Sequence, residues 1–179
     1  MKLLTLIRHA KSSWDHAGLA DFDRPLNGRG HKGARLIGQH LGAEDVSFDR
    51  IIASPAARVR ETLADLLAAT GIKLPKPNWD ERIYLASSAL LLDLIQQTPD
   101  KIGHLAIAGH NPGLHELAVG LAGKGNSKLR VRLADKFPTA AIATLAFDIN
   151  RWSDADWSSA KLERFTRPRD LDSALGPID

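Results

Sequence analysis

Cysteine is absent from the 179-residue sequence, and this absence narrows the chemistry open to the protein. Without thiols the chain forms no disulfide bonds, uses no cysteine nucleophile and offers no thiolate ligands to a metal ion. Any catalytic centre must therefore be built from other side chains. The same absence leaves the redox state of the compartment undetermined.

Long apolar runs and aromatic residues are also scarce. The apolar run near the N-terminus spans only Leu3 to Ile7 before Arg8 interrupts it. It is too short for the core of a signal peptide, and no run approaches the length of a membrane span. Aromatic residues make up 6% of the chain, which provides no platform for stacking nucleic-acid bases. We therefore expect a cytoplasmic protein with neither a membrane nor a nucleic acid as its partner.

The rest of the composition fits an ordinary globular protein. Hydrophobic residues account for 44% and charged residues for 25% of the chain, close to the averages for globular domains. The length is typical of one domain with a sizeable core, so we predict a single domain over residues 1–179. Residues 167–179 contain two prolines and alternating charges, and we expect them to form a peripheral tail.

The net charge of +3 is distributed unevenly along the chain. Residues 1–60 carry ten Lys and Arg against six Asp and Glu, whereas the remainder carries fourteen against fifteen. A local excess of positive charge favours an anionic substrate by steering, and a randomly solvated surface is the alternative. The basic segment 124–136 is predicted as a surface loop or a short helix, with docking of an acidic partner as the alternative role.

The clearest chemical signal follows the first apolar run. Leu3–Ile7 has the composition of a buried parallel strand, and it stops at Arg8 and His9, which small residues follow. An imidazole beside a guanidinium is suited to attack on a phosphoryl group, or to its capture, because arginine offsets charge on the phosphoryl oxygens. A lone histidine after a strand is more often a hydrogen-bonded structural residue. The interpretation therefore depends on other residues that reach the same edge.

A second short strand, Asp49–Ala53, leads directly into a helix. Ser54 is predicted as the N-cap of that helix and Pro55 as its first residue. Arg58 then lies in the first turn, where the helix dipole disfavours a cation, which suggests a compensating anion. Its side chain leans back toward the helix N-terminus and so toward the carboxyl end of the strand.

A third strand repeats this arrangement. Leu105–Ala108 is a buried apolar run that ends at Gly109 and His110. Asn111 is predicted to cap the next helix, with Pro112 as its first residue. The sequence therefore places a second histidine at the end of a strand.

The alternation of strands and helices predicts the fold. The remaining predicted elements are helices capped by Asn27 and by Ser87 or Ser88, strands over 139–147 and 161–166, and a short edge strand or loop over 79–85. Together they predict a three-layer α/β/α architecture with a mainly parallel central sheet. Ligands of such sheets bind beyond the carboxyl ends of the strands. His9, Arg58 and His110 all fall at that edge.

In this order, the motifs at the three strand ends resemble those of the histidine phosphatase superfamily, also called the phosphoglycerate mutase-like family. They are Arg8-His9-Ala10, Ser54-Pro55-Ala56-Ala57-Arg58 and Gly109-His110-Asn111. The chain is similar in particular to the SixA-like phosphohistidine phosphatase branch, through the segments Arg8–Trp14, Asp23–Gly30 and Phe137–Thr139. The resemblance covers residues 2–148 and implies a phosphoglycerate mutase-like fold. Ala10 is a departure, since much of the superfamily has glycine at that position.

The resemblance also implies roles for these residues. His9 would be the nucleophile of a phosphatase and would form a covalent phosphohistidine intermediate. Arg8, Arg58 and His110 would bind the phosphoryl oxygens, and no metal or other cofactor is expected because these groups supply the positive charge. Glu81 is the candidate general acid by its order in the chain, and a surface carboxylate is the alternative. An imidazole leaves from phosphorus more readily than an alkoxide, so a weak acid favours a nitrogen–phosphorus substrate.

We therefore expect hydrolysis of phosphohistidine in a protein. Within enzymes, the alternatives are a small-molecule phosphomonoesterase or a phosphoglycerate mutase-type activity. From a different class, the protein would bind phosphorylated ligands without turnover. Substrate choice is expected to depend on the loops 11–28, 81–86 and 124–136. Lys11 and Arg24 are predicted as solvated loop residues, with substrate contact as the alternative.

Overall fold

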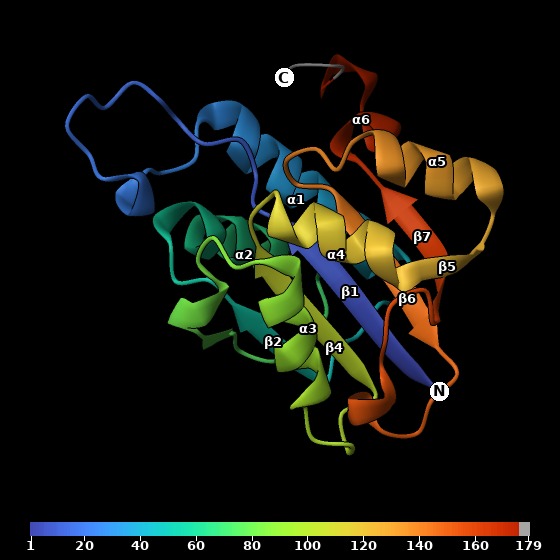
Figure 1. Cartoon of the computed structure of the whole chain (residues 1–179). Coiled ribbons are helices and arrows are strands. Elements are labelled where there is room, and N and C mark those ends of the chain that lie inside the picture. The colour runs from blue at the N-terminus through green and yellow to red at the C-terminus, as the bar shows by residue number, and fades with distance from the viewer. Residues whose placement is uncertain (176–179) are drawn as a thin grey trace.

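The computed structural model describes residues 1–175 and contains a seven-stranded sheet with helices on both faces (Figure 1). The strands are β1 (Lys2–Arg8), β2 (Arg50–Ala53), β3 (Asn78–Trp79), β4 (His104–Gly109), β5 (Ala122–Gly125), β6 (Ile142–Phe147) and β7 (Ala160–Thr166). The helices are α1 (Gly28–Ala43), α2 (Ala57–Ala69), α3 (Ser88–Gln96), α4 (Gly113–Leu121), α5 (Ser127–Asp135) and α6 (Pro168–Leu171). Short 3-10 helices occupy Asp21–Asp23 (η1), Glu81–Ile83 (η2), Trp152–Asp154 (η3) and Ser173–Leu175 (η4).

The sheet has the strand order β3-β2-β4-β1-β6-β7-β5. The first four strands in this order are mutually parallel, whereas β6 runs antiparallel to both β1 and β7, and β5 is parallel to β7. The predicted α/β/α architecture with a mainly parallel sheet is confirmed, and its C-terminal half is mixed. In the register of β1 and β4, Arg8 lies opposite Gly109. The residues that follow these two strands, His9 and His110, therefore stand side by side.

Alternate residues of β1 face two hydrophobic clusters on opposite sides of the sheet. Leu4 and Leu6 belong to the cluster that includes buried residues of α3, α4 and α5. Ile7 belongs to the cluster formed with α1 and α2. Each fully buried side chain of this size stabilises the fold by about 1.5–3 kcal/mol. β1 therefore lies at the centre of the sheet, packed between the two layers of helices (Figure 1).

Two of the predicted helix starts are confirmed. The Asn27 side chain accepts a hydrogen bond from the backbone N–H of Gly30, and α1 begins at the next residue, Gly28. Of the two serines proposed for α3, Ser87 is the cap, since its side chain accepts from the backbone N–H of Leu90. Both caps satisfy donors that the first helical turn cannot pair internally.

The other two predicted caps are wrong. Helix α2 begins at Ala57 rather than Pro55, and the N-cap position is Ala56, which offers no side-chain acceptor. Helix α4 begins at Gly113 rather than Pro112. The physical reason is the same in both cases, because the Ser54 and Asn111 side chains make hydrogen bonds elsewhere.

The C-terminal part adds elements that the sequence only partly predicts. The basic segment forms the short helix α5, the second of the two predicted alternatives, but the edge strand β5 before it was not predicted. Residues 167–175 lie at the border of the fold, where Pro168 is buried and α6 contacts α1. The rest of the predicted tail, 176–179, lies outside the described residues. Within residues 1–175, no helix is long and apolar enough to cross a membrane.

Candidate active site

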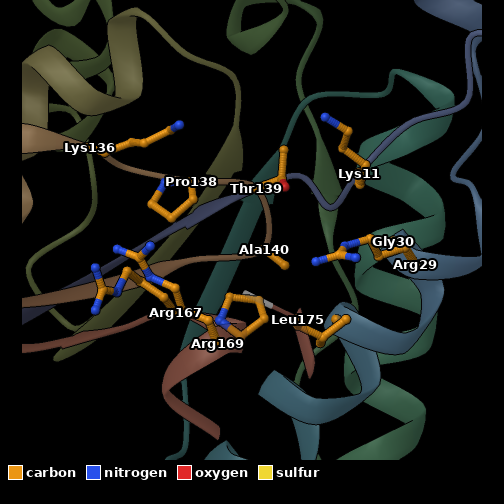
Figure 2. Close-up of a pocket in the computed structure, with 12 residues that line it drawn as sticks. Lys11, Arg29, Gly30, Lys136, Pro138, Thr139, Ala140, Arg167, Arg169 and Leu175 are labelled. Carbon is orange, nitrogen blue, oxygen red and sulfur yellow. The ribbon is translucent and has the colours of Figure 1, made fainter. Parts of the chain in front are cut away.

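The carboxyl edge of the parallel strands carries a pocket of about 410 Å³. Its walls come from the ends of β1 and β4, the start of α2, and the loop that joins β1 to α1. Four residues predicted from the sequence, Arg8, His9, Arg58 and His110, all line it. We call this the catalytic pocket. A second, smaller pocket adjoins it and shares Lys11 and Thr139 with it (Figure 2).

His9 follows directly on β1, and its ring is held in one tautomer. Nδ1 lies 2.7 Å from the carbonyl oxygen of Ala10. Because a carbonyl can only accept a hydrogen bond, Nδ1 must carry the proton. In the neutral ring the lone pair then resides on Nε2. The backbone N–H of His9 also donates to the carbonyl of Gly109 at 3.1 Å, which continues the β1–β4 ladder to the histidine itself.

His110 stands beside His9, with ring centroids 5.3 Å apart and ring planes inclined at 51°. Its Nε2 lies 2.8 Å from Ser54 Oγ, so the serine side chain is occupied with this ring rather than capping α2. Ser54 Oγ also accepts from the backbone N–H of Ala56 at 3.3 Å, and its own proton can be donated to Nε2. In that arrangement Nδ1 of His110 carries the ring proton, and this nitrogen is buried without a partner among the described residues.

Burial keeps both imidazoles neutral. The pKa of His9 is lowered to about 3, mainly by desolvation, with smaller contributions from His110, Arg8 and Arg58 and an opposing contribution from the Ala10 hydrogen bond. Desolvation also lowers the pKa of His110 to about 4, with Arg58 as the next contribution. Both rings therefore lose their protons well below neutral pH. A neutral His9 is the form that can act as a nucleophile.

This electrostatic state can be tested in the free protein. Between pH 5.5 and 8 we expect the ¹⁵N and ¹³C imidazole signals of His9 and His110 to stay constant and to have the chemical shifts of neutral rings. The pKa values of about 3 and about 4 put both titrations below this window. The His9→Asn and His110→Asn variants assign the signals. A titration of either ring with a midpoint inside the window would contradict the expectation.

Each of the two arginines has a buried Nε donor without a partner among the described residues. Burial lowers the pKa of Arg8 to about 10, so the side chain is still charged at neutral pH. One of its terminal nitrogens, Nη1, donates to the carbonyl of Phe137 at 2.8 Å. Arg58 is only 3% exposed. Leaving a buried donor unpaired costs folding free energy. The two Nε atoms and Nδ1 of His110 make three such nitrogens on residues that line one pocket, and an oxyanion there could pair with them.

Asp21 belongs to this site although the sequence did not single it out. Its Oδ2 accepts from Nη2 of Arg58 at 2.9 Å and from the hydroxyl of Tyr84 at 2.7 Å, and its backbone carbonyl accepts from Nη1 of Arg58. Burial alone would raise the pKa of Asp21, but the hydrogen bonds from Tyr84 and Arg58 hold it below the usual value. Asp21 is therefore an ionised carboxylate that fixes one side of Arg58. It lies in η1, within a loop that lacks the periodicity from which a role could be predicted.

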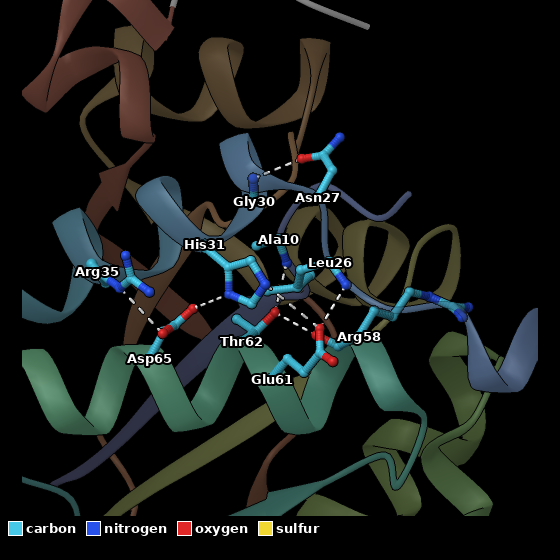
Figure 3. A network of polar contacts seen from close by, with 10 residues as sticks. All are labelled: Ala10, Leu26, Asn27, Gly30, His31, Arg35, Arg58, Glu61, Thr62 and Asp65. Atoms are coloured by element: carbon cyan, nitrogen blue, oxygen red, sulfur yellow. Dashed lines mark hydrogen bonds and ion pairs between the residues drawn. The ribbon is translucent and has the colours of Figure 1, made fainter. Parts of the chain in front are cut away.

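Thr62 of α2 links two segments that border the catalytic pocket (Figure 3). Its hydroxyl accepts from the backbone N–H of Ala10 at 2.9 Å and donates to the carbonyl of Arg58 at 2.6 Å. One side chain of α2 thus ties the loop after β1 to the turn that carries Arg58. The residue next to it in α2, Glu61, accepts from the backbone N–H of Leu26 at 2.6 Å. These bonds set the spacing between His9 and the guanidinium.

Of the other candidate residues from the sequence, two line the catalytic pocket and one does not. Lys11 and Arg24 both line the catalytic pocket, and the Arg24 guanidinium lies 3.6 Å from the ring centre of Trp14. Glu81 is in η2 with an exposed side chain and is not among the lining residues. Its role as a general acid stays a prediction. Within residues 1–175, no group of three or more His, Asp or Glu could hold a metal ion.

The fold is that of a phosphoglycerate mutase-like protein, and its pocket brings together two histidines and two arginines. The chain belongs to the histidine phosphatase superfamily, whose branch 1 profile matches residues 4–111. It is 37% identical over 165 residues to the uncharacterized protein Rv1276c of Mycobacterium tuberculosis strain H37Rv, covering 91% of this chain and 100% of that protein.

Solved structures place the chain near the SixA proteins. A protein of Agrobacterium tumefaciens, assigned as the phosphohistidine phosphatase SixA, is 29% identical with a TM-score of 0.74, over 93% of this chain and 98% of that one. A second protein with the same assignment, from Nakamurella multipartitia, is 26% identical with a TM-score of 0.78, over 93% of this chain and 96% of that one. The chain is SixA-like, and these similarities support a phosphatase.

Proposed function

We propose that the protein is a metal-independent phosphatase that hydrolyses phosphohistidine in proteins through a covalent intermediate on His9. The observation that carries this proposal is the tautomer of His9. Nδ1 donates to the Ala10 carbonyl, so Nε2 of a neutral ring has a free lone pair in a pocket lined by Arg8, Arg58 and His110.

The reaction takes two steps. Nε2 of His9 attacks the phosphorus in line, a new nitrogen–phosphorus bond forms, and the bond to the substrate imidazole breaks. The departing imidazole takes a proton from solvent. Water then attacks the phosphorus, the bond to His9 breaks, and a proton returns to solvent. His9 keeps its Nδ1 proton throughout, so the phosphorylated ring is an imidazolium and leaves readily in the second step. The net reaction converts phosphohistidine and water into histidine and phosphate.

The residues around His9 stabilise the transferring group. Arg8, Arg58 and His110 have buried donors without partners, and these donors would pair with the equatorial oxygens. Preorganised donors of this kind lower the barrier because they need not reorganise as charge develops. Phosphoryl transfer depends mostly on such positioning and charge compensation.

The preference for a nitrogen–phosphorus bond follows from the leaving group. Asp21 is the one carboxylate that lines the catalytic pocket in the described part of the chain, and hydrogen bonds keep its pKa low. It is therefore ionised and unable to protonate an alkoxide. An imidazole leaves with less assistance, so phosphohistidine is the substrate that needs no acid. The assignment of the Agrobacterium relative as a phosphohistidine phosphatase supports the same substrate class.

A comparison of substrates tests the proposal. Purified protein would be assayed on a phosphohistidine peptide, the matched phosphoserine peptide, p-nitrophenyl phosphate and phosphoglycerates, with and without a chelator. We expect kcat/KM for phosphohistidine to exceed that for phosphoserine by roughly 10² or more, the contribution a general acid would otherwise make. The chelator should leave the rates unchanged. Equal rates on both peptides, interconversion of phosphoglycerates, or binding without turnover would each refute it.

A further inference from the structure

The catalytic pocket is larger than a phosphoryl group requires, and its lining has two different parts. A water molecule takes up about 30 Å³ in the liquid, so a volume of about 410 Å³ leaves room for a second chemical group. Of the twelve lining residues within 1–175, ten are polar or charged. The other two, Trp14 and Leu85, are 75% and 56% exposed, and we call them the apolar rim. The buried residues His9, Arg58 and His110 belong to the opposite, polar part, which we call the polar floor.

Trp14 is supported by a stacked guanidinium. The Cζ atom of Arg24 lies 3.6 Å from the centre of the indole ring, within the range of a cation–π contact. The Arg24 side chain is itself only 12% exposed, so it supports the ring from the protein side. Because Arg24 covers one face of the indole and Trp14 is still largely exposed, the other face is open. An open aromatic face at a pocket can stack on a flat ring of a ligand.

One carboxylate links the apolar rim to the polar floor. Asp21 Oδ1 accepts from Nε of Arg24 at 3.1 Å, and Asp21 Oδ2 accepts from Nη2 of Arg58 at 2.9 Å. The same side chain therefore holds the guanidinium that stacks on Trp14 and a guanidinium proposed to bind the phosphoryl group. This chain of contacts places the indole at a defined position relative to the polar floor.

Leu85 has a backbone conformation that bulky side chains rarely adopt. Its φ is 50°, in the left-handed region where glycine and asparagine are favoured. The preceding residue, Tyr84, donates to Asp21 Oδ2 at 2.7 Å and packs edge-on against His110, with ring centroids 5.4 Å apart. Leu85 is thereby kept at the pocket mouth, although neither its backbone nor its exposure favours a leucine. Backbone strain of this kind is concentrated at functional sites.

We propose that the apolar rim binds the leaving group of the substrate and that this group is a flat aromatic ring. The inference rests on the proposed function, which makes the ring the imidazole of the phosphorylated histidine. In-line attack from the polar floor directs the leaving group away from His9, toward the exposed mouth of the pocket. There the imidazole stacks on the open face of Trp14 and contacts Leu85. The loops 11–28 and 81–86, which carry these two residues, thus select the group attached to phosphorus.

The test compares ligands with and without a ring on phosphorus. N-phosphoimidazole and phosphoramidate both have a nitrogen–phosphorus bond to hydrolyse, but only the first has a ring. Phenylphosphonate and methylphosphonate make the same comparison without a cleavable bond. The variants are Trp14→Ala, Trp14→Phe and Leu85→Asn, since asparagine is polar and tolerates a positive φ. The matched control is Trp79→Ala, because Trp79 is also an exposed tryptophan stacked with an arginine, Arg60, but does not line the pocket.

The measured quantity is the ring preference. In hydrolysis it is the ratio of kcat/KM for N-phosphoimidazole to that for phosphoramidate, and in binding it is the ratio of Kd for methylphosphonate to that for phenylphosphonate. Comparing proteins cancels the different intrinsic reactivities of the substrates. Trp14→Ala should lower the ring preference by about tenfold, the scale of a lost stacking contact, and Leu85→Asn by about threefold. Trp14→Phe and Trp79→Ala should stay within about twofold of wild type.

Two results would overturn the inference. One is a Trp14→Ala variant that hydrolyses both substrates with the wild-type ring preference. The other is an equal loss of ring preference in Trp79→Ala. Failure of the proposed function is different, since wild type would then hydrolyse neither substrate. Phosphonate binding decides in that case, and equal affinity of wild type for the two phosphonates would overturn the inference. Thermal unfolding checks that each variant is folded, and Leu85→Asn provides an independent second variant.

Discussion

Replacement of His9 by alanine is expected to lower phosphatase activity by about 10⁴-fold or more, since the nucleophile of a covalent route has no substitute. The variant loses the Nε2 lone pair but keeps the donors of Arg8, Arg58 and His110. It should therefore still bind inorganic phosphate or a phosphate analogue. Steady-state hydrolysis of a phosphohistidine peptide and calorimetric titration with phosphate would measure the two properties separately.

A covalent step also leaves chemical evidence. Wild type quenched during turnover should contain a phosphoryl group that is stable in base and lost in acid, and His9→Ala should contain none. His104→Gln is a matched control, because His104 is a half-buried histidine whose pKa desolvation lowers to about 4, but it lies at the opposite end of β4. Its Nε2 pairs with the Thr5 hydroxyl at 2.9 Å. Activity that survives His9→Ala, or is lost equally in His104→Gln, would rule out the covalent route.

Replacement of Arg58 by alanine should lower kcat/KM by roughly 10³-fold, the scale of an arginine that stabilises a transferring phosphoryl group. It removes the buried Arg58 guanidinium and leaves the Asp21 carboxylate in the pocket, where it faces the substrate's negative charge. Phosphate affinity should fall as well. If charge is the cause, adding Asp21→Asn to Arg58→Ala should restore part of the lost affinity.

Arg60→Ala is the matched control for Arg58. It lies two residues further along α2, donates through Nε to the carbonyl of Pro55 at 2.8 Å, and stacks on Trp79 outside the catalytic pocket. Its activity should stay within about twofold of wild type, since a surface substitution away from the site has small effects. A loss of activity in Arg60→Ala as large as in Arg58→Ala would mean that disruption of α2, rather than loss of the phosphate contact, causes both.

The sequence predicts this fold well where local and tertiary requirements agree. Asn27 and Ser87 cap helices as their positions predict, since nothing else competes for their side chains. Ser54 and Asn111 have side chains that could cap a helix in the same way, but these side chains form hydrogen bonds within the candidate site instead. Ser54 bonds to His110, and Asn111 donates to the Phe137 carbonyl at 3.0 Å. Local rules fail most often at functional sites, and both wrong caps lie there.

The candidate site is predictable only in part for a related reason. His9, Arg58 and His110 follow recognisable strands, so topology alone brings them to one edge. Asp21 reaches the same edge through an irregular loop, whose path depends on tertiary contacts rather than on periodicity. Thr62 looks like an ordinary residue of a helix, and its role depends on which backbone groups lie opposite it. The single-domain organisation and the cytoplasmic location stay predictions.

The register of β1 and β4 has a consequence for how such proteins can diversify. Because the two imidazoles follow hydrogen-bonded neighbours, their separation of 5.3 Å derives from the repeat of the sheet, about 4.8 Å between strands. Insertions or deletions in the surrounding loops leave that spacing untouched. Loops can therefore be exchanged, by evolution or by protein engineering, to admit new substrates while the reactive pair of rings is inherited unchanged.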